Sequence, residues 1–265
     1  MNKKTYMPMI LVILVALVFD FVFAVQFWLK KSEPKAVKSV AGAEDTLPPE
    51  VRAALGRLDT DYAKIRWGCE YTIIDDFPGV VVGVTAYDPS PYHYLAVAVT
   101  NVEEQEVIFS GDMQVKAADD SVIGSGFFFK ELIKPGQTVM HAIDCGTDKK
   151  PDGRIHWENV EMISGEQTLN DPWTADWSLT KEPDFNRVGA DISITGELLT
   201  TPDIKEIDAF LLDSEGNILS GARDFIHDIP LIGAIKDSVF FYIEGRSQDQ
   251  IRDMAVFCSN RQQGE

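Results

Sequence analysis

Apolar and polar residues alternate with a period of two through most of the chain after Trp67. A period of two sends successive side chains to opposite faces of a β-strand. Turn-forming stretches such as DDFPG, DPSP, EEQE, ADDS, KPGQ and DKKPDG separate these short runs. Runs rich in Val, Ile, Phe and Tyr at this spacing, without a strong helical period between them, predict antiparallel strands packed as a sandwich.

The strand pattern occurs twice, with an offset of about 95 residues. The segments that match in order are 94–107 with 191–204, 111–125 with 207–221, 134–144 with 233–243, and 156–164 with 253–259. A period of this length corresponds to one whole sandwich domain rather than to a solenoid repeat. We therefore predict an all-β body of two tandem antiparallel β-sandwiches, at 61–165 and 172–262. The alternative is that small β domains share this rhythm without being copies.

The N-terminal region has a different pattern. Residues 7–29 form an apolar run of 23 residues, preceded by a short tail at 1–6, and Asp20 is its only charge. At about 1.5 Å per helical residue, this run covers the roughly 30 Å hydrocarbon layer of a bilayer. It predicts a transmembrane helix in contact with membrane lipid. The alternative is a signal peptide cleaved after Ala24, although the apolar run continues past that residue.

Residues 30–60 are rich in Lys, Ser, Ala, Pro and Glu and are predicted to be a flexible linker. A short helix is expected near its end. Pro48 and Pro49 precede four apolar residues at helical spacing, and proline is favoured at the first position of a helix. These apolar residues are Val51, Ala54, Leu55 and Leu58.

Charge and composition narrow the function. The chain has 24 Lys and Arg against 42 Asp and Glu, a net charge of −18. Nucleic-acid binding depends on clustered basic residues that neutralise phosphates, so we predict no nucleic-acid partner. Positive charges are nearly balanced across the predicted span, and orientation therefore rests on the β-rich body behind a linker. That plan is typical of an exported ectodomain, and we expect the body to lie outside the membrane.

The second copy carries a short motif. Residues 210–213 read FLLD and are followed by a turn containing Gly216. This stretch resembles the FxLYD signature of bacterial immunoglobulin-like domains, with Leu212 where the family commonly has Tyr. In the first copy, 115–119 matches the signature poorly, but 134–137 (KPGQ) fits the family's later proline-glycine turn. The resemblance implies tandem immunoglobulin-like sandwiches at a cell surface, and it brings no catalytic residues.

Candidate chemistry is sparse. No nucleotide-binding, zinc-protease or serine-hydrolase motif occurs, and the histidines are scattered singly, so we predict no enzyme activity, no metal and no cofactor. A polar-aromatic loop at Tyr92, His93 and Tyr94 is a candidate binding loop, with an exposed turn as the alternative. The candidate interdomain groove comprises Trp157, Trp173 and Trp177, for which packing between domains is the alternative.

Three cysteines are too few for a disulfide scaffold. A bridge between Cys69 and Cys145 is one expectation in an oxidising compartment, and three reduced, buried thiols are the other. The sequence thus predicts a non-catalytic binding or scaffolding protein of the bacterial envelope, with another envelope protein or a surface polymer as its partner. Two alternatives are an accessory subunit that docks through its transmembrane helix and a surface hydrolase.

Overall fold

The computed structural model describes residues 35–37, 47, 55, 59–72, 79–89, 91–167, 174–181, 187–195, 204–226, 235–243 and 248–261. The chain divides into two compact units, Met1–Lys35 and Ala36–Glu265, and the account below concerns the second. The predicted membrane span at 7–29 and Trp173 lie outside the described residues, as does most of the helix predicted after Pro49. Within the described ranges, no helix is long and apolar enough to cross a membrane.

The described part is all-β with antiparallel sheets, as the sequence predicted. The first sandwich segment contains β2 (Cys69–Thr72), β3 (Val80–Tyr87), β4 (Tyr94–Asn101), β5 (Gln105–Ala117), β6 (Val122–Ile133), β7 (Thr138–Asp144) and β8 (Pro151–Gln167). The second contains β9 (Thr174–Lys181), β10 (Arg187–Thr195), β11 (Ile204–Leu212), β12 (Ile218–Ile226), β13 (Ile235–Tyr242) and β14 (Asp253–Arg261). The described residues also include a short strand β1 (Lys35–Val37), a helix α3 (Thr60–Lys64) and a 3₁₀ helix (Gln248–Gln250).

The strands form four sheets, and the two segments share one topology. In the first, β2-β3-β4-β7 forms one sheet and β1-β8-β5-β6 the other. In the second, β13-β10-β9 corresponds to β7-β4-β3, and β12-β11-β14 corresponds to β6-β5-β8. The four segment pairs matched in the sequence fall on these equivalent strands. We call the segments the first and second repeats.

Each repeat has its own core between its two sheets. In the first repeat, side chains such as Val82, Val97 and Phe109 pack around the fully buried Trp157, whose Nε1 donates to Tyr71 Oη at 2.8 Å. The second repeat builds an equivalent core from Val188, Ile192, Ile207, Leu211, Phe241 and Met254, among others. Apolar burial of this kind is the main stabilising contribution in each sandwich.

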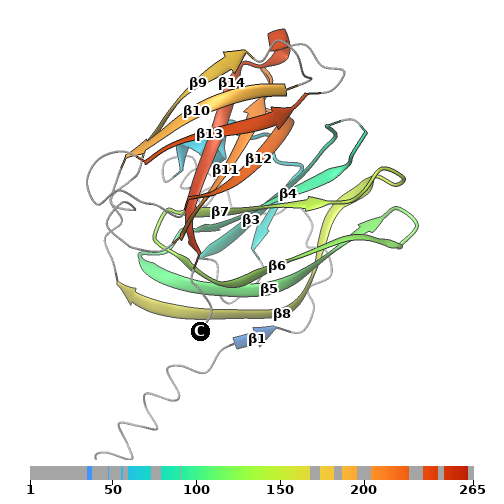
Figure 1. Cartoon of the computed structure of the whole chain (residues 1–265). Coiled ribbons are helices and arrows are strands. Elements are labelled where there is room, and N and C mark those ends of the chain that lie inside the picture. The colour runs from blue at the N-terminus through green and yellow to red at the C-terminus, as the bar shows by residue number, and fades with distance from the viewer. Residues whose placement is uncertain are drawn as a thin grey trace, which may run out of the picture. The chain divides into compact units, whose positions relative to one another are not determined.

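A third core joins the repeats. It lies between β2-β3-β4-β7, here called the first inner sheet, and β12-β11-β14, the second inner sheet (Figure 1). Its members are Leu47, Leu55, Tyr62, Ile65, Val81, Tyr87, Ala96, Ala98, Met140, Phe210, Leu212, Ile218, Ala255 and Phe257. Both faces of the inner sheets are therefore buried. Both predicted sandwiches consequently lie within the single compact unit Ala36–Glu265.

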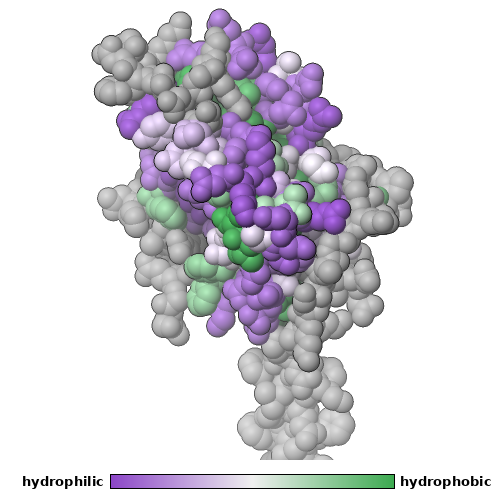
Figure 2. Space-filling model, turned by 90° about the vertical axis from the view of Figure 1, so that its right-hand side faces the viewer, coloured by the Kyte–Doolittle hydropathy of each residue, from purple (hydrophilic) through white to green (hydrophobic). Residues whose placement is uncertain are grey.

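The two remaining sheets have one solvent-facing side each. On β5, buried residues alternate with more exposed ones, so Asp112, Gln114 and Lys116 face outward. A few large apolar residues also reach the surface, including Phe127 and Phe240. Figure 2 shows one face of the molecule, on which hydrophilic residues predominate and hydrophobic residues form small patches near the middle. This surface agrees with the strongly acidic composition.

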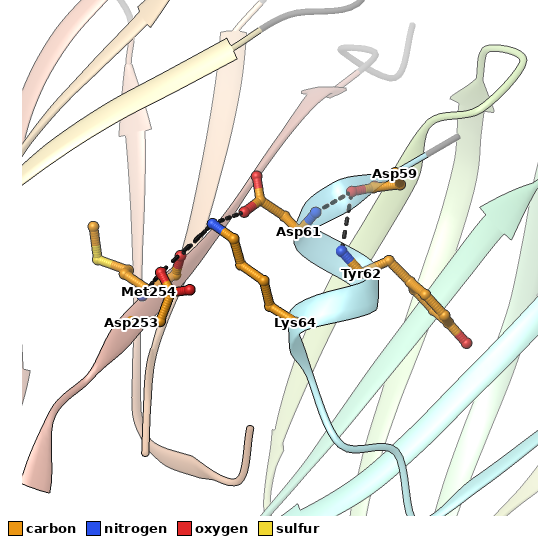
Figure 3. A network of polar contacts seen from close by, with 6 residues as sticks. All are labelled: Asp59, Asp61, Tyr62, Lys64, Asp253 and Met254. Carbon is orange, nitrogen blue, oxygen red and sulfur yellow. Dashed lines mark hydrogen bonds and ion pairs between the residues drawn. The ribbon is translucent and has the colours of Figure 1, made fainter. Parts of the chain in front are cut away.

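Helix α3 links the chain ahead of the first repeat to the second repeat (Figure 3). Asp59 caps the helix by accepting from the backbone N–H groups of Asp61 and Tyr62 at 2.9 and 3.0 Å. At its other end, Lys64 Nζ donates to the Met254 carbonyl of β14 at 3.1 Å and lies 3.6 Å from Asp253. The same ammonium pairs with Asp61 at 2.7 Å. This short helix thus contributes polar contacts to the junction.

The turn between β11 and β12 forms as its sequence indicated. The carboxylate of Asp213 accepts from the backbone N–H groups of Glu215 and Asn217, and Gly216 has a φ of +80°. The turn also contacts the α3–β2 connection, because the N–H of Arg66 donates to the Gly216 carbonyl at 2.8 Å. A Cβ at Gly216 would lie 2.5 Å from the Lys64 carbonyl oxygen. Glycine is therefore required here for both backbone conformation and packing.

Phe210 and Leu212 share one face of β11, as the alternation predicts, and both are buried. However, that face belongs to the core between the repeats and not to the sandwich core of the second repeat, which takes Ile207, Ala209 and Leu211. The physical reason is that β11 is apolar on both faces, so each face packs on a different sheet.

Gly216 offers a direct test of the junction. Replacing Gly216 with Ala should destabilise the full chain by about 1–3 kcal/mol more than replacing Gly153 with Ala, because overpacking costs about that much. Gly153 is a matched control, since its φ of +83° gives the same backbone strain while nothing lies within 4 Å of its Cβ position. Chemical denaturation of both variants measures the difference. Equal losses of stability would show that the turn does not pack against the α3–β2 connection.

Candidate functional site

A cavity of about 560 Å³ lies at the junction of the repeats, at one margin of the core that they share. The first repeat contributes the end of β3, the β3–β4 loop and parts of β4 and β7, and the second contributes β11, β12 and the end of β13. The lining residues are Tyr87, Pro89, Tyr92, Tyr94, Ala142, Asp208, Phe210, Ser220, Gly221, Ala222, Arg223 and Tyr242. Its volume falls in the range of small-molecule sites.

Aromatic rings form much of the cavity wall. The Tyr87 and Tyr94 rings stack with centroids 5.4 Å apart, and Phe210 meets Tyr87 edge-on at 6.1 Å. Tyr87 is only 5% exposed, and no described residue forms a hydrogen bond with its hydroxyl. A Cβ at Gly221 would lie 2.9 Å from that hydroxyl, so the glycine leaves space beside it. The cavity therefore presents aromatic surface together with a buried, available hydroxyl group.

An ionic cluster borders the aromatic wall. Arg223 Nε lies 2.7 Å from both Asp208 Oδ1 and Glu206 Oε1. Arg223 Nη2 donates to the Met140 carbonyl of the first repeat at 3.0 Å, and Nη1 lies 3.5 Å from His141 Nδ1. The guanidinium therefore connects the second repeat with β7 of the first. This cluster both holds the repeats together and shapes the cavity.

The ionic cluster has two carboxylates, Glu206 and Asp208, and one guanidinium. Glu206 and Asp208 are 9% and 3% exposed, and among the described residues both form their ion pair with the same cation, Arg223. Burial raises the pKa of Asp208 from 3.8 to about 7; Arg223 opposes this shift, and Glu206 adds to it. Burial alone would lower the pKa of Arg223, but its two carboxylate partners raise it. Arg223 thus stays charged, while Asp208 changes its protonation state near neutral pH.

The predicted loop residues separate into two roles. Tyr92 and Tyr94 line the cavity, and Tyr92 is 47% exposed at the surface. His93 is not among the lining residues, and its Nδ1 lies 2.8 Å from Asp88 Oδ1. Burial alone would raise the pKa of Asp88, but hydrogen bonds from Lys150 and His93 hold it below its ordinary value. His93 therefore secures the loop that carries the two tyrosines.

The predicted tryptophan groove is not found at Trp157 or Trp177. Trp157 is fully buried in the core of the first repeat, and Trp177 packs against the core of the second. Each indole packs with the core of its own repeat, so the two do not share a wall. The junction is instead lined by tyrosines and Phe210, which sequence reasoning did not single out as a group. Their chain positions are far apart, and only the packing of the inner sheets brings them together.

The sequence left two expectations for Cys69 and Cys145, a bridge or reduced thiols, and both residues are thiols in this structure, with Cys145 buried and Cys69 half-buried. Cys69 begins β2, and Cys145 follows β7, at opposite edges of the first inner sheet. Three strand spacings separate those edges by about 14 Å, beyond the reach of a disulfide. Burial raises the pKa of the Cys145 thiol to about 11. Among the described residues, no group of His, Cys, Asp and Glu could hold a metal ion.

Comparisons with known proteins leave the chain unassigned. No protein-family model matches it, and no curated protein matches it. Two crystal structures of a glycosyl hydrolase family 2 member from Bacteroides cellulosilyticus, one of them from strain DSM 14838, have TM-scores of 0.23 and 7% identity. They cover 64% of this chain, which spans 27% and 28% of theirs. A TM-score this low supports no inference about fold or activity.

The raised pKa of Asp208 predicts that the stability of the folded chain decreases as the pH rises. Between pH 4 and 7, Asp208 keeps a proton in the folded chain that it has released in the unfolded chain. Its contribution to the free energy of unfolding is therefore complete below about pH 4 and is lost as the pH rises through about 7. The loss is on the order of 4 kcal/mol. Asp208→Asn cannot ionise, and its unfolding free energy should decline less over this interval.

Denaturation of the full chain at several pH values measures the difference. Asp88→Asn is the matched control, because it removes a carboxylate whose pKa is lowered and should keep the wild-type decline. An Asp208→Asn profile parallel to that of the wild type would contradict the assignment.

Proposed function

We propose that the chain is a membrane-anchored, non-catalytic binding protein of the bacterial envelope and that its ligand binds in the cavity between the two repeats. The cavity is the observation that carries this proposal. It has the volume of a ligand site, a wall of aromatic side chains and a small set of polar groups. Sites of this kind commonly lie where two domains meet.

The strand order supports an immunoglobulin-like assignment for each repeat. Labelling β9, β10 and β13 as A, B and E, and β12, β11 and β14 as C′, C and F, reproduces the A-B-E and C′-C-F neighbours of that fold. The β11–β12 turn with Asp213 and Gly216 occupies the C–C′ position. This agrees with the resemblance to FxLYD-type domains, which are exported or membrane-anchored.

The site chemistry favours binding over catalysis. Arg223 donates to Asp208 and to the Met140 carbonyl of the opposite repeat, so its guanidinium has a structural role. These contacts hold the two walls together. Asp208 has a second oxygen that can pair with a ligand group in the cavity. Such an arrangement is well suited to holding a ligand in a preformed space.

Location can be tested separately from binding. If the repeats lie outside the cytoplasmic membrane, protease added to intact spheroplasts should degrade residues 61–262 and leave the apolar segment at 7–29. Immunoblotting with antibodies against the second repeat follows the loss. Protection in intact spheroplasts, with digestion only after lysis, would place the repeats on the cytoplasmic side and contradict the proposal.

Ligand binding can be tested by filling the cavity. Small molecules extracted from bacterial envelopes should raise the melting temperature of the purified full chain, because a ligand specific to the folded state stabilises it by about 2.7 kcal/mol at one hundred times its Kd. Ala142→Trp, which adds an indole to the lining, should abolish the increase. Ala118→Trp on the exposed β5–β6 turn is the control and should retain it. Equal responses of both variants, or none in the wild type, would refute a ligand site here.

A further inference from the structure

Among the described residues, the ionic cluster at the cavity wall has two carboxylates and one cationic side chain; Asp208 and Arg223 line the cavity, and Glu206 lies behind them. Arg223 is the only Lys or Arg among the lining residues, and its Nε serves both Asp208 and Glu206. Both carboxylates are at least nine-tenths buried. A buried charge without compensation is costly, so a further positive charge or a proton is favoured at this position. Without a bound cation, a proton on Asp208 can supply this charge.

One oxygen of Asp208 remains available for a ligand. The Arg223 Nε–H contact uses Oδ1, and no described residue hydrogen-bonds to Oδ2. Asp208 lines the cavity beside Phe210, the next residue on the same face of β11. The unpartnered hydroxyl of Tyr87 lies near Gly221 on the adjacent strand, β12. A carboxylate oxygen and a phenol hydroxyl thus share the cavity with aromatic rings.

The aromatic wall favours the same kind of ligand as the carboxylate. The face of an aromatic ring carries negative electrostatic potential and attracts cations, most strongly where water is excluded. The Tyr87 ring contacts both the Tyr94 ring, by stacking, and the Phe210 ring, edge-on. A carboxylate beside several rings is a setting in which alkylammonium groups bind well.

Other ligand classes fit less well. An anion would need free guanidinium donors, but Arg223 Nε and Nη2 already donate within the protein, and Nη1 faces His141. The net charge of −18 repels anions and raises the local concentration of cations. A neutral ligand such as a sugar could use the hydroxyls and rings, but it would not supply the missing positive charge.

From this charge pattern we infer that the cavity binds an organic cation, with an alkylammonium group held between Asp208 and the rings of Tyr87, Tyr94 and Phe210. The inference rests on the proposed ligand site and specifies the chemistry of its ligand. The cation replaces the proton that Asp208 otherwise carries. No covalent step is involved.

Proton release follows from this exchange. The charged and titratable groups that face Asp208 are Glu206 on its own strand, Arg223 on β12 and Tyr87 on β3, with His141 on β7 behind Arg223. Because the pKa of Asp208 is about 7, cation binding should release close to one proton at pH 6 and little at pH 8. As the pH increases toward 7, the affinity for the cation should rise by up to about tenfold per pH unit, and above pH 7 it should level off.

A pair of isosteric probes separates charge from shape. Choline carries a quaternary ammonium group, and 3,3-dimethylbutan-1-ol is its neutral carbon analogue. Isothermal titration calorimetry of the full chain at pH 8 should give at least about tenfold tighter binding of choline. Titrations at pH 6 in two buffers of different ionisation enthalpy should show the released proton.

Two variants locate the charge effect. Asp208→Asn should remove the preference for choline and its pH dependence. Asp88→Asn makes the same change in net charge on the neighbouring loop, where the carboxylate pairs with Lys150, and should leave both intact. Tyr94→Leu keeps every charge and should weaken choline binding while retaining the proton release. This variant keeps the test open if Asp208→Asn does not fold.

Each outcome bears on one of the two proposals. Equal binding of choline and its neutral analogue, or no binding of choline at millimolar concentration, overturns the cation inference. If envelope extracts still stabilise the wild type and not Ala142→Trp, the ligand site stands with a different ligand class. Choline binding that Asp208→Asn and Tyr94→Leu leave unchanged would place the cation elsewhere and overturn the inference as well.

Discussion

The burial of both faces of the two inner sheets is the constraint on which the rest of this structure depends. In β3, β4, β11 and β14, one set of alternate residues fills a sandwich core and the other set fills the core between the repeats. Small residues such as Ala96, Ala98 and Ala255 occupy part of the shared core. Neither inner sheet could expose this second face to water without a large loss of hydrophobic stabilisation. The relation of the repeats is thus fixed by the same force that folds each one.

The packing of the two inner sheets also buries charged side chains that lie on the packed faces. Glu206 and Asp208 alternate with core residues and lie on the same face of β11 as Phe210, so docking buries them as well. Arg223 compensates for part of their charge and reaches the main chain of β7 through Nη2. Where the apolar contact ends, a cavity remains between the tyrosines of the first repeat and the ionic cluster of the second. The candidate site is therefore a product of the junction and belongs to neither sandwich alone.

Much of the local structure was predictable from the chain. The alternation and the turn residues located the strands, and the four matched segment pairs correspond to equivalent strands of the two repeats. The Asp213 and Gly216 turn followed from side-chain chemistry and backbone freedom alone. The shared core was missed, although VVVGV, LAVAV and AFLL are continuous apolar runs, which indicate strands buried on both faces. The sequence could not choose between a Cys69–Cys145 bridge and free thiols, because chain position does not reveal which strands lie between two residues.

The sequence by itself determined the β class, the repeat and the turns, because these depend on residues close together along the chain and on a period of two. The tertiary structure alone decided which face of each sheet meets the other repeat. It placed Phe210 in the junction, buried Trp157 and brought Tyr87, Tyr94, Asp208 and Arg223 around one cavity. Those contacts, such as Arg223 with Met140 and Tyr87 with Phe210, join residues far apart along the chain, and no local pattern encodes them. They arise only when two apolar faces, each formed by several strands, are removed from water together.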